Sequence, residues 1–196
     1  MQQIQVQPAP LEMLEAILSH AQWDQLVATA ADARALLTGR VVWNVNATAH
    51  GGGVAEMLQG LLAYARGAGV DARWLVLDGD SDFFAITKRL HNALHGSNGG
   101  HGFGRLEHEH YQRVLQANSV DLTAQVRPGD IVLLHDPQTA GLVEGVHQAG
   151  AYVIWRSHIG RDDTTANTDS GWEFLRGYLT NADAFVFSRP ATSQTG

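Results

Sequence analysis

The sequence predicts an α/β domain with a Rossmann-like parallel sheet flanked by helices. Short, continuously apolar segments, typical of buried parallel strands, alternate with longer segments in which apolar residues recur at helical spacing. Glycines, prolines and aspartates that favour turns separate these segments. Such alternation indicates right-handed crossovers and a sheet covered on both faces. The apolar segments are residues 41–46, 72–77, 131–134, 152–155 and 184–188.

The composition is that of one ordinary globular domain. Of its 196 residues, 44% are hydrophobic and 17% are charged, which is enough apolar material for a core. A net charge of −7 argues against nucleic acid as a partner, and the lack of cysteine excludes disulfides and thiolate chemistry. The sequence has neither a signal-peptide pattern nor an apolar run that could span a membrane. We therefore expect a cytoplasmic protein without a membrane partner.

The first forty residues precede the sheet. Residues 1–10 are rich in Gln and Pro, and we expect them to be a loose leader. Residues 11–37 have helical periodicity, and Gly39 supplies the stop signal. The expected divisions are 1–38 for the leader and helices, 39–190 for the Rossmann-like domain, and 191–196 for a polar tail.

The first two strands each lead into a helix. The segment 41–46 runs into three glycines and then a helical pattern over residues 54–65. After the second strand, we expect Asp82 to cap the next helix. The apolar face of that helix consists of Phe83, Ile86, Leu90 and Leu94.

The second half of the chain continues the alternation. Residues 96–104, rich in glycine, predict a mobile connection, and residues 106–117 predict a helix. The last three strands follow, with one helix ending near Gly150 and another over residues 172–180.

Polar residues follow three of the predicted strands at the point where each strand ends. Ligands of open α/β sheets bind beyond the carboxyl ends of the strands, so we expect these segments to converge. They are residues 44–53, 135–138 and 156–160.

The first of these segments contains Gly51, Gly52 and Gly53 between a strand and a helix. Without Cβ atoms, they let a phosphate or a sugar approach the backbone at the positive end of the helix. The segment matches neither the dinucleotide-binding fingerprint nor the P-loop, and a simple tight turn explains it equally well.

The other two segments each have two interpretations. His135, Asp136 and Gln138 could orient sugar hydroxyls, or Asp136 could cap a following helix. Arg156 could hold phosphate oxygens, and His158 could bind a sugar or transfer a proton. A lone histidine at a strand end is, however, more often structural.

The predicted helix near residue 90 offers a weaker candidate. Lys88, His91 and His95 lie on one side of it, a spacing that a solvated face explains as well as a binding site does. No spacing of histidines and carboxylates predicts a metal site, and we expect none.

Taken together, these motifs resemble the trehalose-forming glycosyltransferases of family GT4, which include trehalose synthase and trehalose phosphorylase. The resemblance covers about residues 36–190, and its most specific feature is GGGVAE followed by HDPQ. The other matching strings are VNAT, GVDARWLVLDG, DFF, HNALHG, WRSHI and WEF.

The resemblance implies the N-terminal lobe of a two-lobed GT-B enzyme. The implied reaction transfers glucose from NDP-glucose to glucose with retention, giving trehalose; NDP-glucose is a co-substrate and no cofactor is needed. A phosphorylase lobe and a non-catalytic sugar-binding or regulatory module are the alternatives. The nucleotide-binding segment of the family is missing from the sequence. We therefore expect the domain to be inactive without a C-terminal lobe, on the same chain or a separate one, and its inter-lobe surface to favour a homodimer.

The resemblance also assigns roles to residues by motif match. His158 and Asp136 are expected to be catalytic. Gly51, Gly52, Gly53 and Arg156 are expected to hold the phosphate and sugar of the donor. The residues expected around the acceptor are Asn46, Glu56, Lys88, His91, Asn92, His135 and Gln138.

Overall fold

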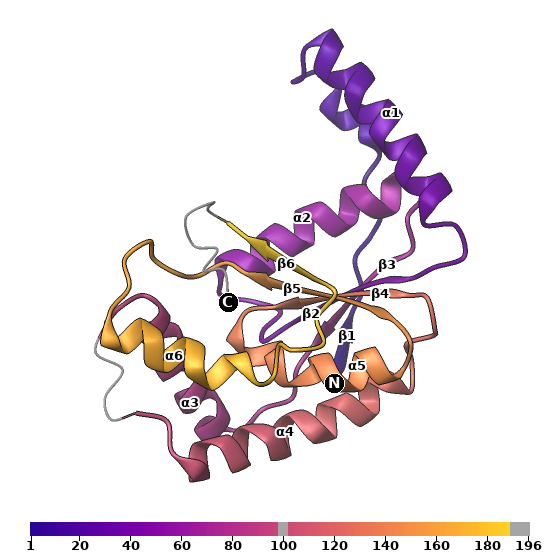
Figure 1. Ribbon diagram of the computed structural model, residues 1–196. Helices are drawn as coiled ribbons and strands as arrows, with labels where there is room; N and C mark the ends of the chain where they lie inside the picture. The colour runs from indigo at the N-terminus through magenta and orange to yellow at the C-terminus, as the bar shows by residue number, and fades with distance from the viewer. Residues whose placement is uncertain (98–101, 189–196) are drawn as a thin grey trace.

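A six-stranded sheet forms the centre of the domain (Figure 1). The computed structural model describes residues 1–97 and 102–188. The strand order is β1-β3-β2-β4-β5-β6, and neighbouring strands are parallel except for β1 and β3. The predicted Rossmann-like sheet is thus confirmed, with one antiparallel strand added at an edge. The strands are β1 Gln2–Ile4, β2 Val42–Asn46, β3 Ala72–Val76, β4 Ile131–His135, β5 Tyr152–Ser157 and β6 Ala184–Phe187.

Helices flank the sheet unevenly. α2 lies on one side of it, whereas α3, α4, α5 and α6 lie on the other (Figure 1). Their bounds, with those of two 3-10 helices, are η1 Leu11–Leu14, α1 His20–Leu36, α2 Gly53–Gly67, α3 Ser81–Leu94, α4 Arg105–Thr123, η2 Pro137–Leu142, α5 Val143–Gln148 and α6 Ala166–Arg176. Among the described residues, no helix combines the length and the hydropathy that crossing a membrane requires.

Two clusters of buried side chains correspond to the two faces of the sheet. The larger cluster packs Trp43, Leu134 and Trp155 against residues of α3 to α6. The smaller cluster packs Trp74 of β3 against α2. Because side chains alternate along a strand, residues next to Leu134 and Trp155 point to the α2 side, where only one helix covers the sheet. That side carries the polar residues described below.

The first residues form β1 and are not the loose leader that their composition predicted. Ile4 lies opposite Trp74 in the sheet, Val6 is buried, and the backbone N–H of Ala9 donates to the carbonyl of Ala63 in α2 at 2.9 Å. Ile4 and Val6 recur at the two-residue period of a strand, which their glutamine neighbours obscured. The leader is therefore part of the fold.

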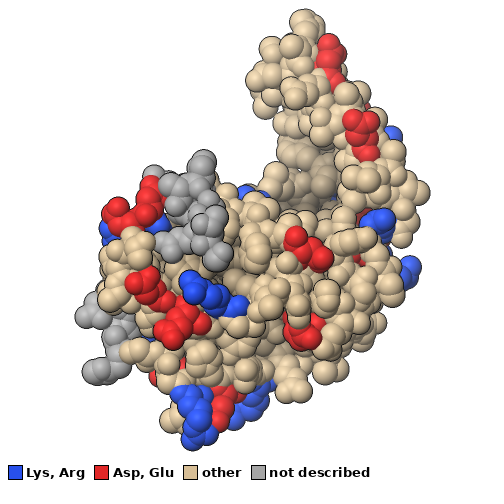
Figure 2. Space-filling view, in the orientation of Figure 1, with Lys and Arg blue, Asp and Glu red and all other residues tan. Residues whose placement is uncertain are grey.

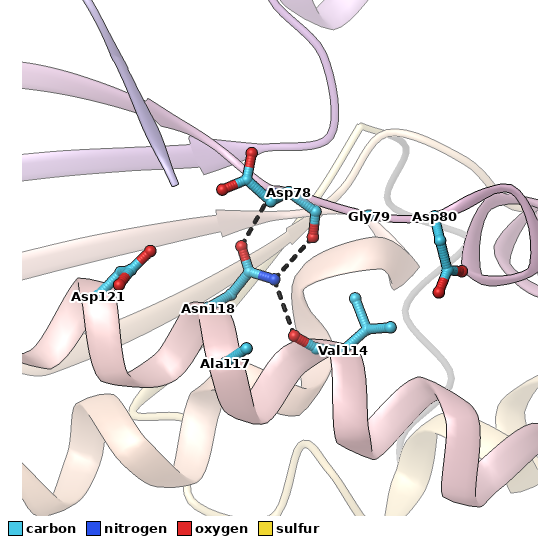
Figure 3. A pocket seen from close by; sticks show the side chains of 7 residues that line it. All are labelled: Asp78, Gly79, Asp80, Val114, Ala117, Asn118 and Asp121. Atoms are coloured by element: carbon cyan, nitrogen blue, oxygen red, sulfur yellow. Dashed lines mark hydrogen bonds between the residues drawn. The ribbon is translucent and has the colours of Figure 1, made fainter.

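A shallow pocket of about 370 Å³ lies where β3 leaves the sheet beside α4 (Figure 3). Asn118 of α4 holds the backbone of Asp78 there, accepting its N–H at 2.9 Å and donating to its carbonyl at 2.8 Å. The Met1 ammonium group contacts the carboxylates of Asp78 and Asp121 at 2.7 and 2.5 Å. These contacts connect β1, β3 and α4.

Several helix boundaries differ from the prediction. Asp80, and not Asp82, caps α3, because its carboxylate accepts the N–H of Phe83 at 2.8 Å. The helix predicted over residues 11–37 is interrupted: η1 is followed by a new start at Ser19, which forms a capping box with Gln22. Only Ala30 of α1 is buried, and α1 projects from the body of the domain (Figure 1).

One predicted segment lies partly, and another wholly, outside the described residues. The mobile connection predicted over residues 96–104 includes 98–101, and the polar tail is 191–196. On the face shown in Figure 2, acidic and basic side chains of the described residues lie in small groups.

Two glycines of α2 provide a matched test of the N-terminal contact. A Cβ added at Gly67 would lie 1.8 Å from the carbonyl oxygen of Ala9, whereas one at Gly60 would meet nothing within 4 Å. We expect Gly60→Ala to raise the free energy of unfolding by about 0.5–1 kcal/mol, as alanine does in helices. Gly67→Ala is expected to lower it and to displace the segment around Ala9. Urea denaturation with hydrogen exchange at Ala9 measures both, and equal stabilisation by the two substitutions would contradict the contact.

Candidate functional site

The candidate site lies at the carboxyl ends of β2, β4 and β5. These strands are adjacent and parallel, so the loops that follow them start at one edge of the sheet. β2 lies between β3 and β4 in the sheet. The chain continues from β2 to β3 on one side of it and later returns to form β4 on the other side. The strand order therefore reverses at β2, where open α/β sheets bind their ligands. The three predicted polar segments begin at this edge.

Asp136, directly after β4, has an unusual backbone conformation. Its φ of 66° and ψ of 175° lie in a region that glycine almost alone occupies, and it is the only non-glycine residue with positive φ in the described part of the chain. Such a conformation costs about 1–3 kcal/mol and persists only where surrounding bonds enforce it. Here the N–H of Asp136 donates to the carbonyl of Arg156 at 2.8 Å, and Trp155 Nε1 donates to the carbonyl of Asp136 at 3.2 Å.

The carboxylate of Asp136 joins two of the three loops. Its Oδ1 accepts the backbone N–H of His158 at 2.7 Å. The side chain makes no capping bond to η2, although Pro137 occupies the first position of that helix. The capping interpretation is therefore wrong for the side chain. Burial raises the pKa of Asp136 to about 6, against the opposing effects of the His158 N–H and the Arg156 charge.

Two histidines and an asparagine are in contact beside Asp136. His135 Nδ1 is 3.0 Å from His158 Nε2, and His135 Nε2 is 3.1 Å from Asn44 Oδ1. His135 and Asn44 are buried, and His158 is half-buried. Burial, with smaller effects of nearby charges, lowers the pKa of His135 to about 3 and that of His158 to about 4. Both rings are neutral at pH 7.

Asn44 begins the predicted polar segment 44–53, but it was not among the residues to which a role in the site was assigned. It lies inside β2, where the sequence reads as an apolar strand. Its neighbours Trp43 and Val45 are buried against the larger core, so the side chain of Asn44 faces the α2 side of the sheet, as His135 does. A polar residue within an otherwise apolar strand was the feature of the sequence that could have indicated a role for Asn44 in the site.

Arg156 supplies the positive charge of the site. It lies opposite His135 in the sheet and is half-buried. Its buried Nε has no hydrogen-bond partner within the described residues. The guanidinium also contributes to lowering the pKa of His135 and His158 and opposes the rise at Asp136. A half-buried cation of this kind suits an anionic ligand group.

The glycine loop after β2 leaves open space. Gly51 has a φ of +76°, which favours glycine, and a Cβ at Gly51, Gly52 or Gly53 would meet nothing within 4 Å. Packing inside the protein therefore does not explain why Gly52 and Gly53 lack side chains. Asn46, at the end of β2, accepts from Trp74 Nε1 and donates to the carbonyl of Thr48, both at 2.7 Å. It thereby fixes the start of the loop.

The remaining predicted acceptor residues lie on helices. Glu56 is exposed in the first turn of α2, and Gln138 is half-buried in η2. Lys88 is exposed on α3, whereas His91 and Asn92 are half-buried there. Directly after α3, the carbonyl of His95 accepts from Arg161, in the loop after β5, at 3.5 Å, and that of Gly96 accepts from Asn167 of α6 at 3.4 Å.

The positions of Lys88, His91 and Asn92 in a sugar site remain predictions. Their helix ends beside the loop that follows His158, but within the described part of the chain these side chains make no hydrogen bond or ion pair with Asp136, His135 or His158. The His91 ring lies 4.8 Å from that of His95, and burial, with the charges of His95 and Lys88, lowers its pKa. Among the described residues, no group of three or more His, Asp or Glu side chains is placed to hold a metal ion.

The strain at Asp136 can be measured with two substitutions. Both Asp136→Gly and Asp136→Ala remove the bond to His158, but only glycine relaxes a φ of 66°. We expect the glycine variant to be more stable than the alanine variant by about 1–3 kcal/mol in urea denaturation. If the alanine variant were equally stable, the positive φ would not be present in solution.

Comparison with known proteins identifies the family. The family model described as trehalose synthase, N-terminal domain, matches residues 44–194. The chain belongs to the trehalose synthase family. It is 38% identical to trehalose synthase of Pyrococcus horikoshii over 156 residues, which are 79% of this chain and 35% of that protein. It is also 38% identical over 154 residues to the enzyme of Rubrobacter xylanophilus, covering 78% of this chain and 36% of that one.

Trehalose phosphorylases are also similar to this chain. That of Grifola frondosa is 27% identical over 154 residues, which are 72% of this chain and 21% of that protein. The chain spans about a third of the length of the trehalose synthases and about a fifth of that of the phosphorylase. The resemblance noted in the sequence is thereby confirmed.

Solved structures show the same fold. The α,α-trehalose-phosphate synthase (UDP-forming) of Burkholderia vietnamiensis has a TM-score of 0.59 at 17% identity, covering 79% of this chain and 40% of that one. The enzyme of Burkholderia xenovorans, solved with glucose-6-phosphate, has a TM-score of 0.59 at 16% identity, covering 79% and 41%. The sheet and helices described above are those of the N-terminal domain of GT-B glycosyltransferases.

Proposed function

We propose that the chain is the acceptor-sugar side of a retaining GT4 glycosyltransferase that forms trehalose from NDP-glucose and glucose. Membership of the trehalose synthase family supports this reaction, as does the identity of 38–39% to synthases against 27–30% to phosphorylases. NDP-glucose would be a co-substrate, without a metal or organic cofactor, and the reaction would be cytoplasmic. A C-terminal nucleotide-binding lobe would complete the site.

The observation that carries the proposal is the bond between Asp136 and His158. A strained residue costs stability, and such residues cluster where function requires them. Here the strained residue uses its carboxylate to hold the backbone of the second predicted catalytic residue at 2.7 Å. The two thus form one unit at the switch point of the sheet, the edge at which GT-B enzymes would bring two sugars together.

The geometry suggests distinct roles for the donor and acceptor sides. In front-face substitution the leaving phosphate assists the acceptor hydroxyl, so that no side-chain nucleophile is needed and the protein mainly positions groups. Arg156 and the open glycine loop from Gly51 to Gly53 would receive the phosphate and sugar of the donor, with Arg156 offsetting the leaving-group charge. Asp136 and His158 would orient the reacting sugars through hydrogen bonds to hydroxyls.

The acceptor glucose would lie between this edge and the end of α3. Glu56, Lys88, His91, Asn92 and Gln138 have side chains that can bond to sugar hydroxyls. Asn46 and His135 have their polar atoms bonded inside the protein, so they would support the pocket from behind.

The proposal is tested by joining this domain to the C-terminal lobe of a synthase relative and measuring trehalose formation from NDP-glucose and glucose. Activity of the joined protein, with weak glucose binding and no turnover by the domain alone, is the expected result. Glucose binding without trehalose formation by the joined protein would favour the sugar-binding module. Absence of glucose binding even at high millimolar concentration would remove support for the acceptor site.

A substitution in the glycine loop tests the donor side. Gly52 has an extended backbone that any residue adopts, and a side chain there has open space. Gly52→Val is expected to preserve the fold, with a loss of about 1 kcal/mol in the free energy of unfolding because Gly52 caps α2, while lowering trehalose formation by about tenfold or more through displacement of the donor. Gly177→Ala, also in open space but at the end of α6, is the control. Equal activity of the two variants would remove the glycine loop from the donor site.

A further inference from the structure

The two histidines of the site are connected to a buried asparagine. His135, at the end of β4, is 1% exposed, and Asn44, on the neighbouring strand β2, is 4% exposed. Each ring nitrogen of His135 has a partner: Nε2 lies 3.1 Å from Asn44 Oδ1, and Nδ1 lies 3.0 Å from His158 Nε2. His135 therefore has no ring nitrogen left for a substrate.

The orientation of the Asn44 amide, whose oxygen faces His135, and the chemistry of these groups together determine where the hydrogens lie. An amide oxygen only accepts, so the hydrogen between Asn44 and His135 is carried by Nε2 of His135. A neutral imidazole has a single N–H, so Nδ1 of His135 accepts, and the hydrogen in that contact comes from Nε2 of His158. Nδ1 of His158 is then left as a bare lone pair.

Neutral rings are what this environment favours. Burial is the largest effect at both histidines, and the Arg156 charge acts in the same direction. The rings lie 5.3 Å apart at an interplanar angle of 22°, so a proton on either would also repel a proton on the other. At neutral pH each of the two rings therefore carries a single N–H, as assigned above.

We propose that Asn44 and His135 are positioning residues that hold His158 as its Nε2–H tautomer, which makes Nδ1 of His158 an acceptor for a sugar hydroxyl. This inference rests on the proposed function, because it assigns His158 to the sugar site. A bare Nδ1 accepts from a hydroxyl but cannot donate to a phosphate oxygen. His158 thus selects the hydroxyl-bearing part of the substrate, and Arg156 is left for its anionic oxygens.

A purely structural role for Asn44 makes a different prediction. A buried polar network that only stabilises the fold would change the free energy of unfolding when broken, without requiring a particular tautomer of His158. The tautomer of His158 is therefore the property that separates the two roles.

The test is nitrogen-15 NMR of the histidine rings in this 196-residue chain at pH 7. In the wild type, His135 and His158 are each expected to show a protonated Nε2 and an unprotonated Nδ1. Asn44→Leu and His135→Phe are expected to convert His158 into a mixture of tautomers, whereas the exposed control Asn181→Ala leaves it unchanged. A wild-type His158 protonated at Nδ1, or an unchanged tautomer in Asn44→Leu, would overturn the proposal. The wild-type spectrum is decisive even if the variants do not fold.

Glucose titration separates this proposal from the proposed function. Glucose is expected to shift the Nδ1 resonance of His158, and Asn44→Leu is expected to weaken glucose binding by about threefold to tenfold, the effect of one neutral hydrogen bond. Glucose binding with His158 as the Nδ1–H tautomer would overturn the positioning role and leave the sugar site intact. The expected tautomers without any response to glucose would instead overturn the sugar site, and with it the acceptor role of Nδ1.

Discussion

Replacement of Asp130 by alanine is expected to lower the free energy of unfolding by about 4 kcal/mol, because buried donors left without an acceptor cost about 1–3 kcal/mol each. Asp130 precedes β4 and is 2% exposed. Its carboxylate accepts the N–H of Val41 at 2.9 Å, Trp43 Nε1 at 3.1 Å and the N–H of Arg127 at 3.0 Å. It therefore joins the starts of the two central strands.

Asp183 provides the matched control for this substitution. It also precedes a strand and accepts a strand N–H, that of Val153, at 2.7 Å, but it is exposed and water can replace it. Asp183→Ala is expected to cost about 1 kcal/mol or less. Urea denaturation of both variants measures the difference, with m-values checked for a common unfolded state. Equal losses would mean that the Asp130 carboxylate does not hold the strands together.

Acidification is the second condition with a large expected effect, and it acts through His135 and, with a smaller shift in pKa, through His158. The native state holds the pKa of His135 near 3, well below its usual 6.5, because the ring is buried beside His158 and Arg156. A lowered pKa contributes stability above pH 6.5 that is lost as the pH falls through 6.5 towards 3. Between pH 7 and about pH 4.5, this loss is on the order of 2 kcal/mol.

His135→Asn isolates this contribution, because asparagine does not titrate. The stability advantage of the wild type over the variant is expected to shrink on acidification by that amount. Asp136 acts in the opposite direction in both proteins: its raised pKa of about 6 stabilises the native state as the pH falls through 6 towards 3.8. Unfolding measured at several pH values gives the two curves. Parallel curves would show that His135 is not buried as a neutral ring.

The parallel strands could be predicted from the sequence because each is a continuous apolar run bounded by turn residues. β1 could not, since three residues next to glutamines acquire strand character only by pairing with β3, far away in the chain. The sequence did not show whether Asp80 or Asp82 caps α3, because both are aspartates. The cap is decided by the extended backbone of Asp80, which residue type does not predict. The start of α1 was different: Ser19 and Gln22 have the spacing of a capping box, which was readable.

The sequence predicted which loops form the candidate site, but not the contacts between their residues. The rule that ligands bind beyond the carboxyl ends of parallel strands brought Asp136 and His158 together, and their hydrogen bond agrees with it. The positive φ of Asp136 was not predictable, because tertiary bonds and not residue type impose it. Nor was the contact of Asn44 with His135, two residues 91 positions apart whose meeting depends on the register of β2 and β4.

The pairing of β2 with β4 has a consequence for biosynthesis. Asp130 meets Val41 across 89 residues of sequence, so the two central strands cannot join until the ribosome has released the chain beyond β4. Until then, a nascent β2 presents one unpaired, apolar edge, the kind of surface that aggregates. Because the central strands pair across a long stretch of sequence, whereas the helices form locally, we expect this domain to fold slowly.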